Sequence, residues 1–258
     1  MKLIISIRAE LLKIKGTASI WLSGIVGAIV PLGLFLHFVI WPNDGIKEIA
    51  PNAWQQFFIL GWEVFTAFLL TLFIVLLCTS IPQIEVKNNT WKQVFSSPQP
   101  VHNIFLSKFV VIQVMILFCF ASFNILMIFA VVLLDFIHPI YEFFKKDVNF
   151  DILFQLNVKT YISILALSAF QYYLSLRFAN FIFPVGIGII LMIGAFVVTS
   201  FNWSYNDFYP YTYPILSFDS VKDASGAFIQ THELISIACS VFFLLAGWIT
   251  MKMQKVKA

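Results

Sequence analysis

Charged residues are scarce in this chain. Lys, Arg, Asp and Glu make up 11% of its 258 residues, while hydrophobic residues make up 60%. Soluble domains carry about 25% charged residues, and the mean hydropathy here is +0.90. The scarcity of charge excludes a soluble globular fold. It predicts an all-α membrane protein, in which each spanning helix satisfies its own backbone hydrogen bonds.

Cysteine is also rare, with three residues that each lie inside an apolar run. An odd number, none of them in a polar loop, argues against a disulfide framework. The four histidines lack the spacing of metal ligands, and His232-Glu233 is not followed by the second His of a zinc-protease helix. We expect no metal site. We expect Cys78, Cys119 and Cys239 to pack as small apolar side chains.

Motifs for catalysis and for nucleotide binding are missing as well. The chain has no G-x-x-x-x-G-K-[ST] loop, so it cannot hold nucleotide phosphates as a P-loop ATPase does. It has no Ser/His/Asp arrangement and no paired carboxylates on a common face. The net charge of +3 gives no reason to expect nucleic acid as a partner. The sequence therefore predicts no catalytic residue and no cofactor in this chain.

Long apolar runs are what the chain does contain. Six are long enough to cross a bilayer, since a span needs about 20 predominantly apolar residues. An even number of spans places both termini on one side, and no linker divides the chain, so we expect a single transmembrane domain, residues 1–258. The six runs are Thr17–Trp41, Phe57–Ile81, Phe109–Leu134, Thr160–Leu176, Phe181–Phe201 and Leu234–Met251.

The basic residues predict which side the termini face. Eleven of the 16 Lys and Arg residues lie in the terminal segments and in the two connections on the same side as the termini. The acids are distributed the other way, because only Glu10 and Glu85 lie on that side. An excess of Lys and Arg marks the cytoplasmic side of a membrane protein. We therefore expect both termini in the cytoplasm.

The first 16 residues are typical of an interfacial helix. Ile4, Ile7, Leu11 and Ile14 recur at helical spacing, and the basic residues of the segment lie opposite them or on the flank. A basic amphipathic helix of this kind rests in the headgroup plane with its apolar stripe toward the hydrocarbon. A simple anchor for the first span is the alternative interpretation.

The stretch Ile84–Lys108 is the most informative one. It is basic, it lies between two apolar runs, and residues 82–108 are predicted to form a cytoplasmic loop. Its residues follow the spacing E-x4-T-W-K-x5-P-x9-K, and this pattern resembles the cytoplasmic loop of ABC-2-type transporter permeases, in particular the lantibiotic- and bacitracin-immunity branch. The residues of the pattern are Glu85, Thr90, Trp91, Lys92, Pro98 and Lys108.

The resemblance implies an architecture and a set of partners. Permeases of this family are type V exporter-like: they begin with an amphipathic helix, span the bacterial cytoplasmic membrane six times and work as homo- or heterodimers. The loop holds a coupling helix that presses on a separate ABC ATPase subunit, which binds ATP and Mg. In this chain the resemblance assigns that coupling to Glu85, Thr90, Trp91, Lys92 and Pro98, with Trp91 as an aromatic anchor for a pocket on the ATPase.

Polar residues within the spans are candidate sites. Glu63 is the one acid clearly inside a span, and an acid in hydrocarbon is a functional candidate by default. It lies near the predicted external end, so a substrate contact and an interfacial or packing role both remain open. For Gln113, Asn124 and Gln171 we expect hydrogen bonds between helices.

Residues 202–232 form a predicted external loop, and its first half is rich in Trp, Tyr and Pro. Pro210 and Pro214 are expected to stop any continuous helix there. An interfacial belt of aromatic side chains is one interpretation. The resemblance implies another, a lid that folds back over the exit path and packs against the dimer partner, with a gate at Tyr211, Tyr213 and Pro214.

These observations favour the membrane subunit of an ATP-driven ABC exporter. By resemblance alone, the cargo is a peptide antibiotic or an amphipathic, lipid-like molecule. An intramembrane lipid-modifying enzyme is an alternative, but it would need several acids or His residues around one cavity. An ATP-independent channel or scaffold is the second alternative. Association with an ATPase would separate these functions.

Overall fold

The computed structural model describes residues 2–49, 52–88, 99–145, 147–201, 203, 205–223 and 228–257. All regular structure in these ranges is helical. A π-helical turn, η1, joins α4 to α5, and three short 3-10 turns occur in the connections. The elements are α1 (Lys2–Ile14), α2 (Ala18–Ile40), α3 (Pro42–Ile49), α4 (Ala53–Val64), η1 (Phe65–Leu69), α5 (Leu70–Lys87), α7 (Val101–Ile137), η2 (Pro139–Tyr141), η3 (Phe143–Lys145), α8 (Phe150–Arg177), α9 (Ile182–Ser200), η4 (Asn206–Phe208), α10 (Tyr213–Lys222) and α11 (Thr231–Lys257).

Within the described part of the chain, six helical stretches are long and apolar enough to cross a membrane, as the hydropathy predicted. The third and fourth helical stretches are longer than the apolar runs from which they were predicted, because the ends of these helices carry polar residues. The fold class is confirmed as an all-α membrane protein. The stretches are Ala18–Ile40, Ala53–Val86, Val101–Ile137, Phe150–Arg177, Ile182–Ser200 and Thr231–Met253.

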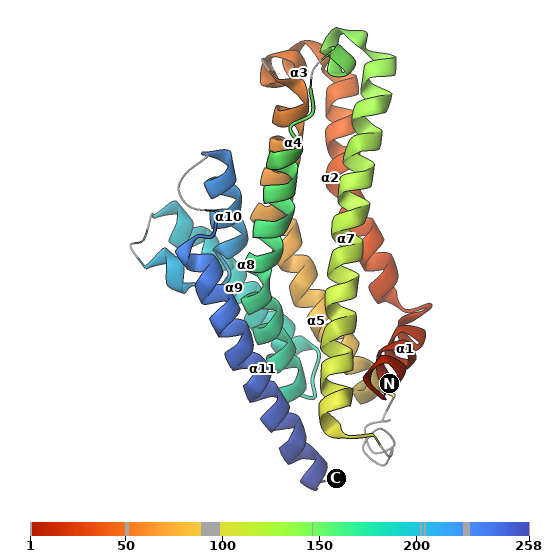
Figure 1. Ribbon diagram of the computed structural model, residues 1–258, viewed down its shortest axis with the longest axis vertical. Helices are drawn as coiled ribbons and strands as arrows, with labels where there is room; N and C mark the ends of the chain where they lie inside the picture. The colour runs from red at the N-terminus through yellow and green to blue at the C-terminus, as the bar shows by residue number, and fades with distance from the viewer. Residues whose placement is uncertain are drawn as a thin grey trace.

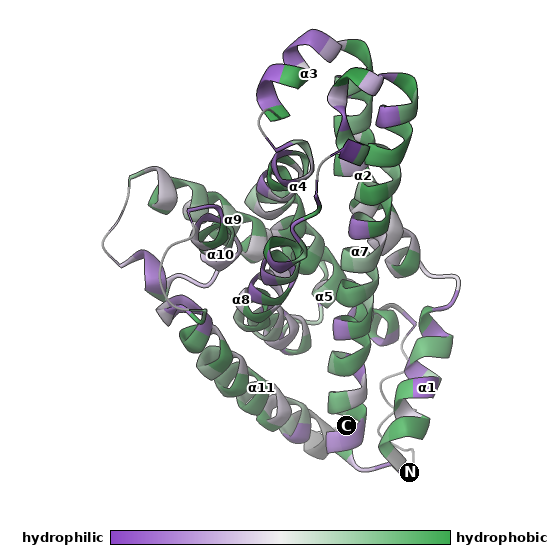
Figure 2. Ribbon diagram, turned by 45° about the horizontal axis from the view of Figure 1, so that its top comes forward, coloured by the Kyte–Doolittle hydropathy of each residue, from purple (hydrophilic) through white to green (hydrophobic). Residues whose placement is uncertain are grey.

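The helices form an elongated bundle with two distinct ends (Figure 1). At the basal end lie both termini, α1, the last turns of α5 and the first turns of α7. The distal end carries α3 and the turns that follow α7. Along the bundle, α2 packs against α7, α11 packs against α8, and α5 packs against α8 and α9. Hydrophobic residues cover most of the long helices, and hydrophilic residues gather near their ends (Figure 2).

An aromatic cluster fixes the second span against the third. The Trp62 ring lies edge-on to the Phe123 ring with 5.1 Å between centroids, and Phe65 stacks on Phe123 at 4.4 Å. All three side chains are buried. Edge-to-face and offset-stacked geometries are the ones aromatic pairs favour. Trp54 of α4 donates a hydrogen bond from its ring nitrogen to the carbonyl of Phe143, at a distance of 2.7 Å. Phe143 lies in η3, in the connection after α7, so this bond holds η3 against α4.

The predicted loop 82–108 was too long. α5 continues to Lys87, although Pro82 lies inside it, and α7 begins at Val101. The polar residues near these helix ends suggested a loop, but Glu85 and Lys108 are buried and satisfy one another across the helices. Four of the five predicted coupling residues lie outside the described residues: Thr90, Trp91, Lys92 and Pro98.

The predicted external loop contains a helix that the sequence did not predict, because Pro214 was expected to stop a helix and instead lies in one. α10 occupies Tyr213–Lys222, with Pro214 in its first turn. Proline is tolerated there because the first backbone N–H groups of a helix have no partner within the helix. α10 lies along the side of the bundle, where it contacts α8, α11, η1 and α4. It lies nearer the basal end than α3 does (Figure 1).

Candidate functional site

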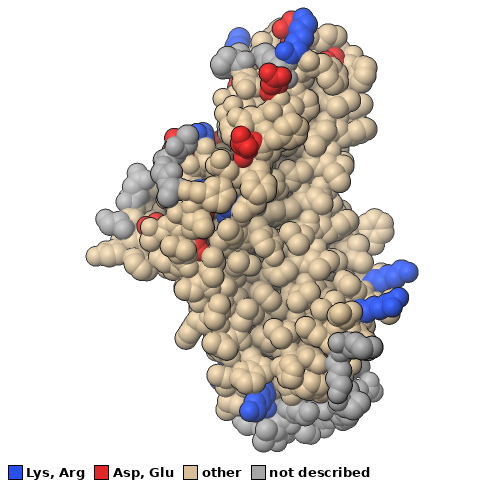
Figure 3. All heavy atoms as spheres, viewed as in Figure 1, with Lys and Arg blue, Asp and Glu red and all other residues tan. Residues whose placement is uncertain are grey.

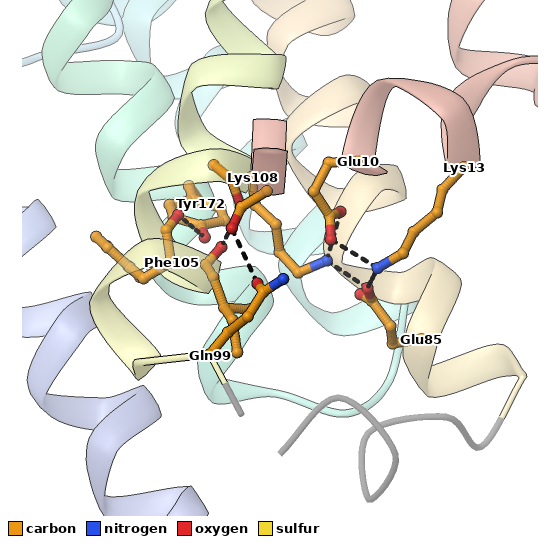
Figure 4. A network of polar contacts seen from close by, with 10 residues as sticks. Glu10, Lys13, Glu85, Gln99, Phe105, Lys108 and Tyr172 are labelled. Carbon is orange, nitrogen blue, oxygen red and sulfur yellow. Dashed lines mark hydrogen bonds and ion pairs between the residues drawn. The ribbon is translucent and has the colours of Figure 1, made fainter. Parts of the chain in front are cut away.

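Four charged side chains contact one another at the basal end, where α1, α5 and α7 meet (Figure 4). Lys108, near the start of α7, contacts Glu85 of α5. Its Nζ lies 2.8 Å from Oε2 of Glu10 on α1. Lys13 Nζ, also from α1, lies 2.6 Å from Glu10 Oε1 and 3.1 Å from Glu85 Oε1. We call these four residues the basal charge network.

The network is balanced in charge and largely shielded from solvent. The Lys108 side chain is fully buried and that of Glu85 is 3% exposed, whereas that of Lys13 is 40% exposed. Burial alone would raise the pKa of Glu10, but Lys108 and Lys13 outweigh burial and hold that pKa below its ordinary value. Burial alone would lower the pKa of Lys13, but Glu10 and Glu85 raise it. Glu10 and Lys13 are therefore both charged at neutral pH.

The network orients α1 differently from the predicted amphipathic helix. Ser6, Glu10 and Ile14 are its buried residues, at the four-residue spacing of one helix face. Of the predicted apolar stripe, Ile14 is buried but Ile4 is 71% exposed. The stripe is divided in this way because the ion pairs with α5 and α7 draw the Glu10 side of the helix toward the protein. Ile4 and Leu12 then face away from the bundle.

Hydrogen bonds extend the network along the basal end. Ser6 Oγ donates to Gln99 Oε1 at 2.9 Å, and Tyr172 Oη of α8 donates to the carbonyl of Phe105 on α7 at 3.0 Å. Gln99 is the first described residue after segment 89–98, and α5 ends just before that segment. The network therefore lies beside both ends of the predicted coupling segment.

A cavity of about 610 Å³ opens between the last turns of α5 and the connection from α8 to α9. The side-chain amide of Gln83 donates to the carbonyl of Phe178 at 3.0 Å and ties α5 to that connection. On α5, Glu85 lies between two of the residues that line the cavity, Ile84 and Val86. Its lining consists of Ser80, Gln83, Ile84, Val86, Ala179, Asn180 and Phe181.

A second buried polar group joins α8, α10 and α11, and we call it the α10 polar cluster. Lys159 Nζ lies 3.8 Å from Glu233 Oε1 and donates to Ser220 Oγ at 3.1 Å. Ser217 Oγ lies 3.0 Å from His232 Nε2 and 3.4 Å from Glu233 Oε1. Lys159 is 3% exposed and Glu233 is fully buried. The cluster holds the middle of α10 against the two long helices.

Glu63, the predicted intramembrane acid, belongs to neither group. Its side chain is 49% exposed, and its Oε2 lies 3.0 Å from Lys222 Nζ at the end of α10. The pair links α10 to α4 across the outside of the bundle. Among the described residues, Glu63 thus forms a partly exposed ion pair that connects two helices.

The predicted gate residues are buried inside this chain. Tyr211 is 3% exposed, and its hydroxyl donates to Gln171 Oε1 at 3.0 Å. Tyr213 and Pro214 are buried as well. Gln171 also donates to the carbonyl of Pro184, so it joins α8, α9 and the segment before α10. These tyrosines pack within this chain, and the gate and the packing of the loop against a dimer partner stay predictions. Replacing these buried side chains with Ala would leave a cavity in the protein.

The comparisons with known proteins bear on the whole of this arrangement. The sequence model of the family described as ABC-2 family transporter protein matches residues 6–195. The chain belongs to the ABC-2 transporter family. No protein of curated function and no solved structure matches it. This ABC-2 protein is accordingly a transport component of the membrane and not itself an enzyme, and its family implies an ABC ATPase as partner.

The matched range covers the complete basal charge network of the ABC-2 protein. It runs from within α1 to within α9, so Glu10, Lys13, Glu85 and Lys108 all lie inside it. α10 and α11 lie beyond its end. The α10 polar cluster therefore combines Lys159 from the matched range with partners from outside it.

Polar residues within the spans of the ABC-2 protein make the contacts that their positions predicted. Asn124 Nδ2 donates to Asn157 Oδ1 at 2.9 Å, and Gln113 Nε2 donates to Ser168 Oγ at 3.2 Å, both between α7 and α8. Cys78, Cys119 and Cys239 are free thiols. Within the described ranges, no group of three or more His, Cys, Asp or Glu could hold a metal ion.

The prediction from the sequence missed two features of the site. It treated Glu85 as a partner for an ATPase side chain, but Glu85 is buried against Lys108 and Lys13 of its own chain. It also did not predict that Glu10 and Lys159 are buried ion-pair partners. The available signal was an isolated charge at the margin of an apolar run, where an unpaired charge would be costly.

Proposed function

We propose that this chain is the permease subunit of a bacterial ABC exporter and acts as a dimer with two ATPase subunits. The observation that carries the proposal is the basal charge network beside both ends of segment 89–98. In that segment the pattern of Thr90, Trp91, Lys92 and Pro98 resembles a coupling helix. The network joins α1, α5 and α7 where such a helix would act.

The orientation belongs to the same proposal, with the basal end in the cytoplasm. Exposed cations of the described residues at that end include Arg8, Lys15, Arg177 and Lys252. The two acids there, Glu10 and Glu85, are neutralised by Lys13 and Lys108. Exposed positive charge that is not offset by exposed acids supports a cytoplasmic position. Figure 3 shows Lys and Arg, and no Asp or Glu, over the basal part of the face in view.

In this proposal the network transmits movement. An ATPase that closes on ATP pushes the coupling segment, and the push arrives at the last turn of α5 and the first turn of α7. Breaking buried ion pairs is costly, so α1, α5 and α7 move as one unit. The other helices then rearrange around that unit, which is the essence of alternating access. An amphipathic peptide or a lipid-like molecule remains the proposed cargo, on the resemblance of the loop.

The alternatives predict other arrangements of polar groups. An intramembrane lipid-modifying enzyme needs reactive groups around an accessible cavity, and the α10 polar cluster, which holds His232 and Glu233, is buried instead. An ATP-independent channel needs no coupling contact at all. The exporter proposal therefore depends on association with an ATPase.

Co-purification tests the proposal. The chain is affinity-purified from cells that also express candidate ABC ATPases, and we expect one ATPase to remain bound and to hydrolyse ATP. Trp91→Ala is expected to abolish this association, because a buried aromatic anchor accounts for about 2 kcal/mol or more of binding energy. Trp203→Ala is the matched control, since Trp203 is 52% exposed and lies on the predicted external side. Retention of the ATPase by Trp91→Ala, or its loss in both variants, would contradict the coupling role.

Cysteine labelling tests the orientation separately. Gln99→Cys should resist a membrane-impermeant maleimide added outside intact cells, and Asp223→Cys should react. Gln99 is half-buried at the basal end and Asp223 is exposed after α10. The opposite pattern would reverse the topology.

A further inference from the structure

A groove lies between α7 and α11 near the basal end, and none of its lining residues belongs to the charge network or to the α10 polar cluster. Its volume is about 290 Å³. One wall comes from α7 and the other from α11, with residues three, four and seven positions apart, which is the spacing of a single helix face. Apart from His102, the lining is apolar: Phe105 and Leu106 of α7, and Val241, Leu244, Leu245 and Trp248 of α11.

The back of the groove is closed by a glycine contact. A Cβ placed on Gly247 would lie 3.1 Å from the Phe105 ring, so the absence of a side chain at position 247 allows this close contact between α11 and α7. The Phe105 ring itself is fixed by Tyr172, 5.2 Å away between ring centroids. The groove is therefore a preformed feature of the packing between the two helices. It opens outward along residues such as Leu245, which is 55% exposed.

The groove is positively charged at its basal mouth. Lys252 Nζ lies 5.6 Å from the centroid of the Trp248 ring, one turn beyond the last groove residue on α11. His102 lines the mouth from α7. No acid occurs among the lining residues, and the described acids of the basal end, Glu10 and Glu85, are paired with lysines.

This arrangement matches the two parts of a lipid. The apolar walls extend from Trp248 to Val241, seven residues or roughly 10 Å of helix, toward the middle of the bundle. That part accepts a hydrocarbon chain but no headgroup, and 290 Å³ is at the lower limit for an enclosed small-molecule site. Trp248 and Lys252 lie in the last turns of the span Thr231–Met253, and Trp near the end of a span favours the membrane interface while Lys there reaches lipid headgroups.

We propose that the groove binds an anionic phospholipid of the leaflet at the basal end, with one acyl chain between α7 and α11 and the phosphate beside Lys252. A helix of a second copy would also cover an apolar groove. It would leave Lys252 without an anionic partner, however, so the charge at the mouth favours the lipid.

The bound chain would contact the charge network through α7. Phe105 forms the back of the groove, and Lys108 lies three residues further along the same helix. A lipid that fills the groove supports the turn of α7 that carries Lys108. Bound lipid is therefore expected to affect the link between α7 and α1 without touching any residue of the network.

Fluorescence quenching by brominated lipids tests this proposal. The full chain is placed in nanodiscs of zwitterionic phospholipid that contain a small share of dibrominated lipid, either anionic or zwitterionic. The chain has seven Trp residues, so the Trp248 signal is taken as the difference between wild type and Trp248→Phe, which keeps an aromatic ring in place. We expect anionic brominated lipid to quench this signal several-fold more strongly than zwitterionic brominated lipid does.

Charge variants then locate the headgroup. Lys252→Gln should reduce the anionic preference about fivefold, the contribution of one Lys at an anionic surface. The matched control is Lys15→Gln, because Lys15 is an exposed basal cation on another helix. Equal quenching by both lipids, or an equal effect of the two Lys variants, would overturn the anionic site. Absence of quenching by either lipid would mean that protein covers the groove, and it would overturn the proposal as a whole.

Discussion

The basal charge network and the α10 polar cluster both bury lysine with glutamate, yet they differ in how those charges are satisfied. In the basal network, two Lys and two Glu from three helices contact one another directly, with Lys108 Nζ 2.8 Å from Glu10 and also in contact with Glu85. In the α10 polar cluster, the Lys159–Glu233 separation is 3.8 Å. Neutral groups take up the remaining hydrogen-bonding capacity there.

The difference shows two ways to hold an element on a membrane bundle. Glu233 accepts from the backbone N–H of Gln230 at 2.9 Å and from Ser217 at 3.4 Å, so it keeps polar contacts even without Lys159. The basal network depends on the balance of full charges, and half of it comes from α1, a helix outside the spans. The basal connection is therefore the more sensitive of the two to the loss of one charge.

The largest effect is expected from Lys108→Met. The change leaves Glu10 and Glu85 buried beside a single partly exposed Lys13, and removal of one member of a buried ion pair costs about 3–5 kcal/mol of unfolding free energy. Thermal unfolding in detergent, followed by size-exclusion chromatography, measures the loss. The double variant Lys108→Met with Glu85→Met should recover much of the stability, since an apolar pair replaces the charged one. A stable single variant would remove the basis of the comparison.

A smaller loss is expected from Lys159→Met in the α10 polar cluster. Glu233 keeps its contacts with Gln230 and Ser217, so we expect a cost of about 2–3 kcal/mol. The same unfolding assay compares the two lysines directly. If Lys159→Met proved more damaging than Lys108→Met, the neutral hydrogen bonds would not compensate as described, and the ranking of the two sites would be reversed.

Acid should weaken the basal network through Glu10. Its pKa in the folded protein lies below the ordinary value of 4.5, so its contribution to stability is complete above about pH 4.5 and is lost as the pH falls through the folded pKa. The pKa of Lys13 is raised above 10.5, so its contribution is complete below that value and is lost as the pH rises through the folded pKa. Glu10→Gln should lower the free energy of unfolding by about 1–2 kcal/mol at pH 7. It should also reduce the loss of stability that the wild type shows as the pH falls below about 4.5. If the variant lost stability in acid as steeply as the wild type, Glu10 would not be the group that controls this loss.

The smallest effect is expected at the exposed pair on the outside of α10. Glu63 and Lys222 are each more than 40% exposed, and exposed ion pairs contribute about 0–1 kcal/mol. Glu63→Gln should therefore change the free energy of unfolding by less than the error of most assays. Lys222→Gln should have an equally small effect on the free energy of unfolding. If Glu63→Gln instead impaired transport at normal stability, Glu63 would have a role beyond that of holding α10.

Hydropathy was enough to predict the six spans, because a run of apolar residues has the same meaning wherever its neighbours lie. It also predicted hydrogen bonds between helices for Asn124 and Gln113. It could not extend α5 to Lys87 or begin α7 at Val101, because polar residues near the end of a span look the same in a loop as in a helix. Only packing distinguishes the two cases.

The ion-pair partners in the basal charge network and in the α10 polar cluster could not be predicted from the sequence for a related reason. Lys108 pairs with a residue 98 positions away, and no local pattern identifies a contact of that range. α10 was missed because Pro214 was interpreted as a stop, whereas a proline in the first turn of a helix is compatible with it. The part of the predicted coupling pattern that precedes α7, apart from Glu85, lies outside the described residues and remains a prediction.

The π-helical turn η1 has a consequence for insertions and deletions in the second span. Its signature is the hydrogen bond from the Leu70 N–H to the Phe65 carbonyl, five residues back, so this turn holds one residue more than an α-helical turn. Removing one residue from Phe65–Leu69 would convert the turn to α-helix and leave the helix faces on both sides in register. A deletion between Leu70 and Ile84 would instead rotate Glu85 by about 100° around the helix axis and carry it away from Lys108. The wide turn is thus where this span can change length and still keep the orientation of α5.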